Sequence, residues 1–263
     1  MLGYEIPLPP LSEQRRAVAR IEELAAQIHE ARPLRHQAAE EADALARSHL
    51  HELFGDFYTG RVGKVQLNRW ERMEEVVHDV ADGPHVTPTY VPDGVPFITV
   101  LNITSGRIRF GDHKFITAED HTQFRRQAKA GRGDVLISKD GTIGVPCFID
   151  TDREFSFFVS VALIRPKRKV LDGEFLTWAL RAPYLQERIA ARSRGDMIRH
   201  LVLREIRDLT IPVPPLLEQR RIVSELDALQ TEVDALKRLQ AETAAELAAL
   251  LPALLDRAFK GEL

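Results

Sequence analysis

The sequence contains one motif twice, and this internal repeat constrains the fold more than any other feature. The segment IPLPPLSEQRR at residues 6–16 returns as IPVPPLLEQRR at residues 211–221, an offset of 211 − 6 = 205 residues. A long segment rich in alanine, leucine and glutamate follows each copy, and a stretch of different composition separates them. We therefore expect two related helices with an inserted domain between them.

Each copy carries the signals of a helix start. In the second copy, Pro214 and Pro215 fix the backbone angle φ, and proline is tolerated in a first helical turn because its missing N–H would have no partner there. Glu218 then falls near the positive end of the helix dipole. A long helix is expected to begin directly after each proline pair.

Residues in the second helix recur with alternating steps of four and three, which is the spacing of a coiled-coil seam. These residues are Ile222, Leu226, Leu229, Val233, Leu236, Gln240, Thr243, Leu247, Leu250 and Leu254. Subtracting 205 gives the first-copy seam of Ala17, Ile21, Leu24, Ile28, Ala31, Arg35, Ala38, Ala42, Leu45 and His49. The two helices are therefore predicted to form a coiled coil.

Two features interrupt this seam. Arg35 and Gln240 are polar and occupy the same level, where a polar residue lowers stability but can fix register and partner. Pro33 and Pro252 are expected to kink or break their helices.

Composition limits the classes of protein that fit. The 263 residues suffice for one sizeable domain plus a helical stalk, and the formal charge of −3 provides no bulk attraction to nucleic acid. Cys147 is the one cysteine, so it is expected to be a buried apolar residue in a reducing compartment. The sequence shows neither a run of eighteen apolar residues nor a signal peptide. We predict a cytoplasmic protein without a membrane partner.

The inserted segment mixes helix and strand patterns, so the fold class is α+β. Helices are expected at residues 71–80, 118–130, 174–191 with an interruption at Pro183, and 201–209, and strands at 95–103, 107–110, 134–138, 144–149 and 155–164. Phe54, Phe57 and Tyr58 are expected to pack the first helix against this domain. The predicted domains are a first arm at residues 1–60, a mixed α/β domain at 61–210 and a second arm at 211–263.

Basic residues in the inserted domain gather in three patches, at residues 125–139, 165–169 and 181–207. Inside a nearly neutral domain, such patches are what a surface that follows a phosphate backbone needs. Solvated helix faces and strand ends explain any single patch equally well.

Several ordered motifs resemble the DNA-specificity subunit of type I restriction-modification enzymes. They are PLPPLSEQ and PVPPLLEQ at the starts of the two long helices, VTPTYVPDGVPFITVLNI from residue 86, KAGRGDVLISKDGTIG from residue 129, and FLTWALRAPYLQERIAARSRG from residue 175. The resemblance covers residues 6–263. It implies a target-recognition domain flanked by two long helices that form an antiparallel coiled-coil spacer.

The resemblance also implies partners. The chain would bind double-stranded DNA and dock modification (methyltransferase) subunits, and through the complex a restriction subunit. S-adenosylmethionine would bind in the methyltransferase subunit, and this chain would hold no cofactor and no metal. Complete members of the family carry two recognition domains, whereas this chain has one, and GDMIRHL at residues 195–201 departs from the family pattern.

The dimensions agree with this interpretation. About 40 residues at 1.5 Å each give an arm of roughly 60 Å, close to two turns of B-DNA at ~34 Å per turn. Such a stalk can hold two reading domains on successive major grooves. The second domain would come from another chain, either in a homodimer or in a partner half-subunit.

Base readout needs side chains with paired donors and acceptors, and loops are the expected place for them. The candidate DNA-binding residues are Thr87, Thr89, Tyr90, Asn102, Lys139, Asp140, Thr142, Arg192, Arg194, Arg199 and His200. For each of these, a role in a turn or simple solvation is at least as common as base contact.

Two other classes of protein fit parts of the sequence. Asp93 and Asp112 with Lys114 match the loose carboxylate and lysine pattern of a magnesium-dependent nuclease. The sequence contains no phosphate-binding loop of the GxxxxGK type and no Asn-Pro-Pro-aromatic motif for base methylation. The main alternative is a coiled-coil assembly protein whose inserted domain binds protein. We expect a non-catalytic specificity subunit.

Overall fold

The computed structural model describes residues 10–54, 69–193 and 200–260. It divides into two compact units. Residues 1–46 with 228–263 form the first, here called the stalk unit, and residues 47–227 form the second, the globular unit. Each unit is described by itself.

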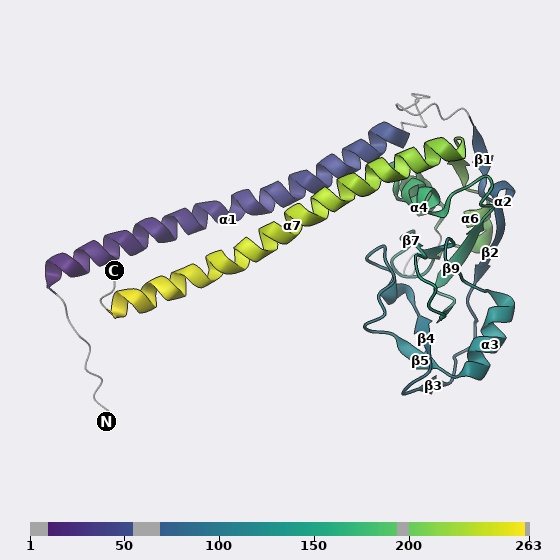
Figure 1. The fold of residues 1–263 in the computed structure, drawn as a ribbon, viewed down its shortest axis with the longest axis horizontal. Helices are drawn as coiled ribbons and strands as arrows, with labels where there is room; N and C mark the ends of the chain where they lie inside the picture. The colour runs from purple at the N-terminus through teal and green to yellow at the C-terminus, as the bar shows by residue number, and fades with distance from the viewer. Residues whose placement is uncertain (1–9, 55–68, 194–199, 261–263) are drawn as a thin grey trace. The chain divides into compact units, whose positions relative to one another are not determined.

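The two long helices begin where the proline pairs predict. Helix α1 (Leu11–Phe54) and helix α7 (Leu216–Phe259) each span 44 residues (Figure 1). The carbonyl oxygen of Pro10 accepts the N–H of Glu13 at 2.9 Å, and that of Pro215 accepts the N–H of Glu218 at 2.9 Å. Each proline pair thus supplies the first acceptor of its helix.

Of the expected kink or break at the internal prolines, the structure contradicts the break. Pro33 lies inside the continuous α1, and Pro252 lies inside the continuous α7. A proline in a helix interior costs about 3 kcal/mol. Both helices stay continuous despite this cost.

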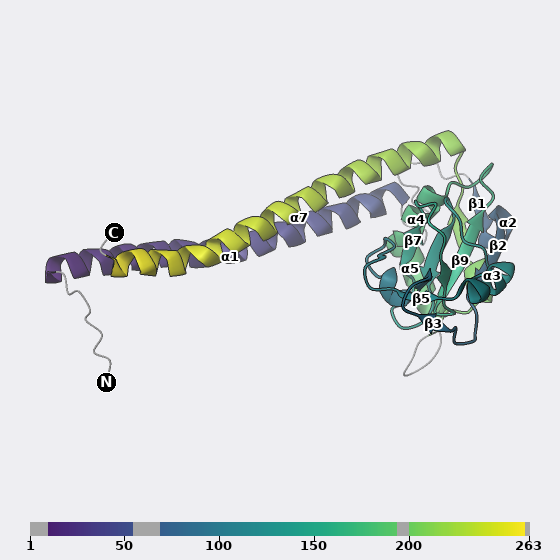
Figure 2. The same ribbon diagram turned by 60° about the horizontal axis from the view of Figure 1, so that its bottom comes forward.

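Inside the stalk unit, α1 and α7 lie side by side, as both ribbon views show (Figures 1 and 2). Arg35 hydrogen-bonds Gln240, and Lys237 pairs with Asp43 at 2.5 Å. As the position on α1 rises from 35 to 43, its partner on α7 falls from 240 to 237, so the helices run antiparallel. The predicted coiled coil is confirmed and forms within one chain.

Burial follows the predicted seam except at Leu45, Thr243 and Leu250, which are exposed. Ile28 and Val233 are buried at seam positions, whereas Leu45 is 63% exposed. The neighbouring Ala46 is half-buried in its place. The first-copy seam therefore steps from Ala42 to Ala46, and the position predicted for Leu45 is wrong.

The described residues of the globular unit form three sheets. The first joins β2 (Val77–Asp82), β9 (Val161–Pro166), β6 (Val135–Ser138) and β7 (Pro146–Phe148) in this order, all antiparallel. The second joins β3 (Tyr90–Val91), β5 (Lys114–Ile116), β4 (Val95–Ile98) and β8 (Ser156–Phe157), and β4 runs parallel to β8. Strands β1 (Trp70–Arg72) and β10 (Thr210–Pro212) pair antiparallel.

The remaining helices of the globular unit are short. They are α2 (Met73–Val76), the 3₁₀ turn η1 (Val100–Asn102), α3 (Ala118–Gln127), α4 (Gly173–Arg181), α5 (Pro183–Arg192) and α6 (Leu203–Arg207). Thr117 caps α3 by accepting the N–H of Asp120 at 3.1 Å, which satisfies a donor with no partner inside the helix. The mixed α+β class predicted from the sequence is confirmed.

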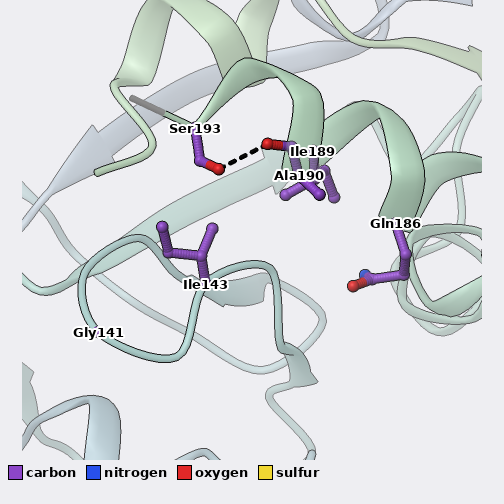
Figure 3. A pocket seen from close by; sticks show the side chains of 6 residues that line it. All are labelled: Gly141, Ile143, Gln186, Ile189, Ala190 and Ser193. Carbon is purple, nitrogen blue, oxygen red and sulfur yellow. Dashed lines mark hydrogen bonds between the residues drawn. The ribbon is translucent and has the colours of Figure 1, made fainter. Parts of the chain in front are cut away.

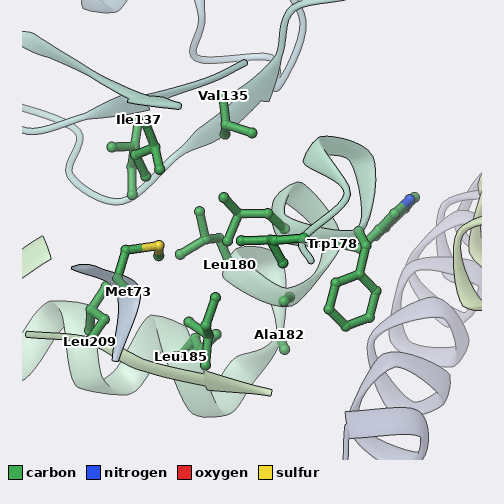
Figure 4. Packing of buried hydrophobic residues seen from close by; sticks show 14 of the residues in the cluster. Met73, Val135, Ile137, Trp178, Leu180, Ala182, Leu185 and Leu209 are labelled. Carbon is green, nitrogen blue, oxygen red and sulfur yellow. The ribbon is translucent and has the colours of Figure 1, made fainter. Parts of the chain in front are cut away.

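Strand β6 explains how the core is built. All four of its residues are buried, and they alternate between two clusters: Val135 and Ile137 face one, and Leu136 faces the other. Side chains alternate across a strand, so both faces of this sheet are covered. The first cluster contains side chains of α4 and α5 (Figure 4), and it includes Phe54, whose ring lies 5.8 Å from Phe175. The predicted packing role of Phe54 is confirmed, whereas Phe57 and Tyr58 lie outside the described residues.

Several predicted elements are wrong in type or length. Residues 71–80 form β1, α2 and β2 rather than one helix, and residues 107–110 form no strand. The predicted strand at 95–103 is β4 followed by a 3₁₀ turn, and the run at 155–164 is split into β8 and β9. The turn between β8 and β9 is closed by the N–H of Val161, which donates to the carbonyl of Phe158 at 3.0 Å.

Candidate nucleic-acid interface

Lys139 and Asp140 follow β6, at the start of the predicted glycine turn. The ammonium of Lys139 lies 3.5 Å from a carboxylate oxygen of Asp82 and 4.0 Å from one of Asp140. The side chain of Lys139 is only 12% exposed. Its charge is therefore used largely inside the protein, where it joins the end of β2 to the turn after β6.

His200 joins the same turn from a distant part of the chain. It forms an isolated antiparallel bridge with Asp140, and its Nδ1 lies 2.7 Å from the Asp140 carboxylate. The N–H of Leu201 donates to the carbonyl of Lys139 at 2.9 Å. Three predicted site residues are thus brought together, and the His200 side chain remains 55% exposed.

The glycine turn is held rigidly and presents one exposed hydroxyl. Gly141 and Gly144 have φ values of +72° and +82°, which favour glycine because other residues are strained there. Ser138 closes the turn, since its carbonyl accepts the N–H of Gly144 at 2.8 Å and its hydroxyl accepts the N–H of Val145 at 2.9 Å. Thr142 is exposed in this turn.

The first predicted loop begins at the same carboxylate. Asp82 lies 3.3 Å from the Nε2 atom of His85, and the exposed Thr87 follows shortly after. Thr89 donates its backbone N–H to Asp120 at 2.7 Å. The ammonium of Lys114 lies 4.4 Å from the centre of the Tyr90 ring, a cation–π contact at the loop end.

A hollow of about 210 Å³ lies beside the glycine turn (Figure 3). Its walls are Gly141, Ile143, Gln186, Ile189, Ala190 and Ser193. The amide nitrogen of Gln186 donates to the carbonyl of Gly144 at 2.8 Å, and the hydroxyl of Ser193 donates to that of Ala190 at 2.7 Å. These two donors therefore stabilise the glycine turn and the end of α5. The side chains that line the hollow thus have a structural role in holding the turn.

Asn102 is buried, and its amide serves the loop around it. Its oxygen accepts the N–H of Thr99 at 2.9 Å, and its nitrogen lies 3.3 Å from the carbonyl of Arg109. Contact with a base would require these bonds to break. The position of Asn102 fits a loop-supporting role.

The last group of predicted residues is only partly described. Arg192 ends α5 and lies 3.7 Å from the carboxylate of Glu205, half-buried. Arg194 and Arg199 lie outside the described residues.

Many cations of the three basic patches form ion pairs with acidic residues that the sequence analysis did not place near them. Arg125 pairs with Glu154, and Arg132 lies 2.8 Å from Asp152. Arg165 and Arg168 both face the buried Asp134, at 3.8 and 3.5 Å. Burial raises the pKa of Asp134, and the two arginines oppose this shift. Exposed cations without an ion pair among the described residues include Arg107, Arg126 and Lys169.

Among the described residues, Lys114 of the nuclease alternative forms no ion pair with Asp93 or Asp112, and its ammonium lies over the Tyr90 ring. In the described ranges, no group of three or more histidine, cysteine, aspartate or glutamate side chains is placed to hold a metal ion. Cys147 is fully buried, as expected, and burial raises the pKa of its thiol to about 12. None of the described helices is long and apolar enough to cross a bilayer.

The chain thus carries an α+β domain whose candidate loops meet at Asp82. In the sequence this domain is inserted between two paired helices that start with the same motif, and this combination defines the class of protein. The family model for the type I restriction modification DNA specificity domain matches residues 87–244, more than half of the chain. The chain belongs to this family.

Known relatives agree with this assignment. The EcoBI specificity subunit of Escherichia coli is 24% identical over 98% of this chain and 58% of its own length. A chain from a structure of a type I restriction-modification system is 32% identical with a TM-score of 0.76, covering 98% of this chain and 62% of that chain. The HsdS subunit of Thermoanaerobacter tengcongensis is 32% identical with a TM-score of 0.63, at 98% and 60% coverage.

Two conclusions follow from the family. Because these relatives are specificity subunits, the expectation that the chain is not itself an enzyme agrees with the assignment. The chain spans about three fifths of the length of the relatives it matches.

Proposed function

We propose that this chain is a non-catalytic, sequence-specific DNA-binding subunit of a type I restriction-modification complex. Residues 61–210 would form a target-recognition domain that reads one half of a bipartite site. The carrying observation is the convergence of three distant segments: Asp82 and His85 before the first loop, Lys139 and Asp140 in the second, and His200. One network of polar contacts thus supports both predicted reading loops.

The network divides the candidate residues into two roles. Lys139 and Asp140 neutralise neighbouring charges, so they position the loops. Thr87, Thr142 and His200 are exposed and carry the donors and acceptors that read base edges in the major groove. Thr89, Tyr90 and Arg192 stay candidates for contact with the sugar and phosphate backbone.

Partners follow from the rest of the chain. The exposed faces of α1 and α7 would dock methyltransferase subunits, which would carry S-adenosylmethionine, and the restriction subunit would join through the complex. A second specificity chain, or a second copy of this one, would read the other half of the bipartite site. The mass of the purified chain, alone and with a methyltransferase subunit, distinguishes these two sources.

Binding to DNA duplexes tests the proposal. In a bandshift titration, the affinity for one short bipartite sequence should exceed that for random competitor by about 10³ or more and should fall steeply with salt, as specific protein–DNA complexes do. Binding without sequence preference, or without dependence on salt, contradicts the proposal. The alternative, a coiled-coil assembly protein whose inserted domain binds protein, predicts this absence of sequence preference.

Single substitutions test the reading loops. Thr142→Ala or His200→Ala should weaken the specific complex by about 1–3 kcal/mol, the usual cost of a lost base contact, and leave non-specific affinity unchanged. Thr122→Ala is the matched control because its exposed hydroxyl donates to the helix carbonyl of Ala118 at 2.8 Å. An equal loss in Thr122→Ala would rule out the assigned loops.

A further inference from the structure

Arg35 joins the two long helices of the stalk unit through several hydrogen bonds. Its Nε donates to the side-chain oxygen of Gln240 at 2.9 Å, and one Nη donates to the Gln240 carbonyl at 2.8 Å. The same Nη also donates to the hydroxyl of Thr243. One half-buried guanidinium thus binds three acceptors on α7, and these acceptors belong to the second copy of the repeat.

The positions of Arg35 and Gln240 are equivalent in the two copies, because 240 − 35 = 205 is also the offset of the repeated motif. In an antiparallel pair of related helices, equivalent residues face each other only at the local two-fold axis. Arg35 and Gln240 therefore mark that axis. At this level the two copies differ in charge, while the backbone arrangement is symmetric.

This symmetry creates a competing arrangement between two molecules. Near the axis, the numbers of two residues that face each other add to 35 + 240 = 275. If a second α1 took the place of α7, each α7 number would be lowered by the repeat offset of 205, and facing residues would add to 275 − 205 = 70. Arg35 would then face the partner's Arg35. Two guanidinium groups would meet at a half-buried level, and each would lose its three acceptors on α7.

The exchange has to be considered as a whole. Two α1–α7 pairs would become one α1–α1 pair and one α7–α7 pair. In the α7–α7 pair, Gln240 would face the partner's Gln240, which amide groups tolerate because they both donate and accept. The α1–α1 pair brings like charges together at a seam position, where polar residues specify the partner. Arg35 therefore disfavours the complete exchange.

We propose that Arg35 is a partner-selecting residue, which commits the first-copy helix to a second-copy helix and prevents two chains from pairing like copies. The proposal concerns assembly and does not depend on DNA binding. It assigns to one residue the choice between an α1–α7 stalk and a stalk built from equal helices. A chain with two related arms needs such a choice.

The test uses the full chain with one spin label. Cys147 is replaced by alanine, and a nitroxide is attached at Gln37→Cys, an exposed position. In an α1–α1 pair the two labels are offset along the axis by about 2 × 2 × 1.5 = 6 Å and lie within roughly 30 Å of each other. An α1–α7 stalk within one chain brings no second label to this position.

Arg35→Gln makes the two copies identical at the axis, so a short distance between labels on two chains should appear. The parent protein should show none. In the exchanged pair Arg35→Gln with Gln240→Arg, the charge difference is restored and the short distance should be lost again. Absence of the signal in Arg35→Gln overturns the proposal, whether the helices stay paired or separate. A signal of equal size in the exchanged pair overturns it as well.

Discussion

The side-chain amide of Gln219 donates to the carbonyl oxygen of Val170 at 2.8 Å from a completely buried position. It also donates to the carbonyl of Pro214 at 2.7 Å, and its oxygen accepts the N–H of Asp172 at 2.8 Å. Asp172 in turn caps α4. One glutamine therefore joins the start of α7 to the turn before α4, which gives a structural reason for glutamine in the second copy of the repeated motif.

Gln219→Leu should destabilise the globular unit strongly. The substitution leaves two carbonyl groups and one N–H buried without partners, and each costs ~1–3 kcal/mol. We expect the free energy of unfolding to fall by about 3 kcal/mol in urea titration. Gln123→Leu, at an exposed position of α3, is the control and should change it by less than about 0.5 kcal/mol. Equal effects of both substitutions would show that the buried amide has no special role.

Gly83 should not tolerate alanine. A Cβ atom there would lie 2.0 Å from the carbonyl oxygen of Phe157, which is backbone and cannot turn away. Gly83→Ala should lower the free energy of unfolding by ~1–3 kcal/mol or more, as overpacking does. Gly111→Ala meets no atom within 4 Å and serves as the control. Thermal unfolding of the two variants measures the difference, and a Gly83→Ala protein as stable as the control would contradict the close approach of Gly83 to Phe157.

Much of the helical seam was predictable because its periodicity directly records burial. Ile222, Leu226 and Val233 are buried as the spacing predicts. The prediction failed at Leu45, where subtracting the repeat offset assumed that both copies keep one register. Burial near the end of α1 instead follows Ala46 and Leu50.

Elements that depend on distant partners were harder to predict. Residues 71–80 have the pattern of an amphipathic helix, yet Val80 pairs with Ile164 in a ladder between β2 and β9. Pairing across the sheet outweighs local helical preference when both faces are covered. The strand DVLIS was predictable because all four residues of Val135–Ser138 are apolar or small and fit a strand that is buried on both faces.

For the candidate site, the sequence identified segments better than roles. Lys139 fits a positive group for DNA, but its partner Asp82 lies 139 − 82 = 57 residues away, which no local pattern reveals. Asp82 itself was missed, although it directly precedes the loop that contains Thr87. Asn102 has the donor and acceptor of a base-reading residue, but it is buried and its amide supports the surrounding loop.

His121 should make the stability of the globular unit depend on pH. Burial lowers the pKa of this imidazole below its ordinary 6.5, Arg125 lowers it further, and Glu154 at 3.8 Å opposes the shift. The unfolded chain therefore binds the proton more readily. The stability contributed by the neutral imidazole is complete above about pH 6.5 and falls as the pH drops below that value.

His121→Gln removes this titration and can keep a hydrogen bond to Ser156, whose hydroxyl lies 2.8 Å from His121 Nδ1. The difference in free energy of unfolding between parent and variant, measured by urea titration at several pH values, should favour the parent most above about pH 6.5 and shrink below it. A difference that is constant with pH would contradict the lowered pKa.

Arg126 should contribute to DNA affinity through charge alone. It is exposed on α3 without an ion pair among the described residues, whereas Arg132 is neutralised by Asp152 at 2.8 Å. Each phosphate contact contributes about −0.9 to the slope of log affinity against log salt concentration. Arg126→Ala should therefore make the slope shallower by about that amount for specific and random duplexes alike. The double variant Arg132→Ala with Asp152→Ala keeps the net charge and should leave the slope unchanged. The prediction is contradicted if the double variant alters the slope and Arg126→Ala does not. In that case Arg132, rather than Arg126, lies against the phosphates. An ion pair within residues 125–139 would then not exclude an arginine from DNA contact.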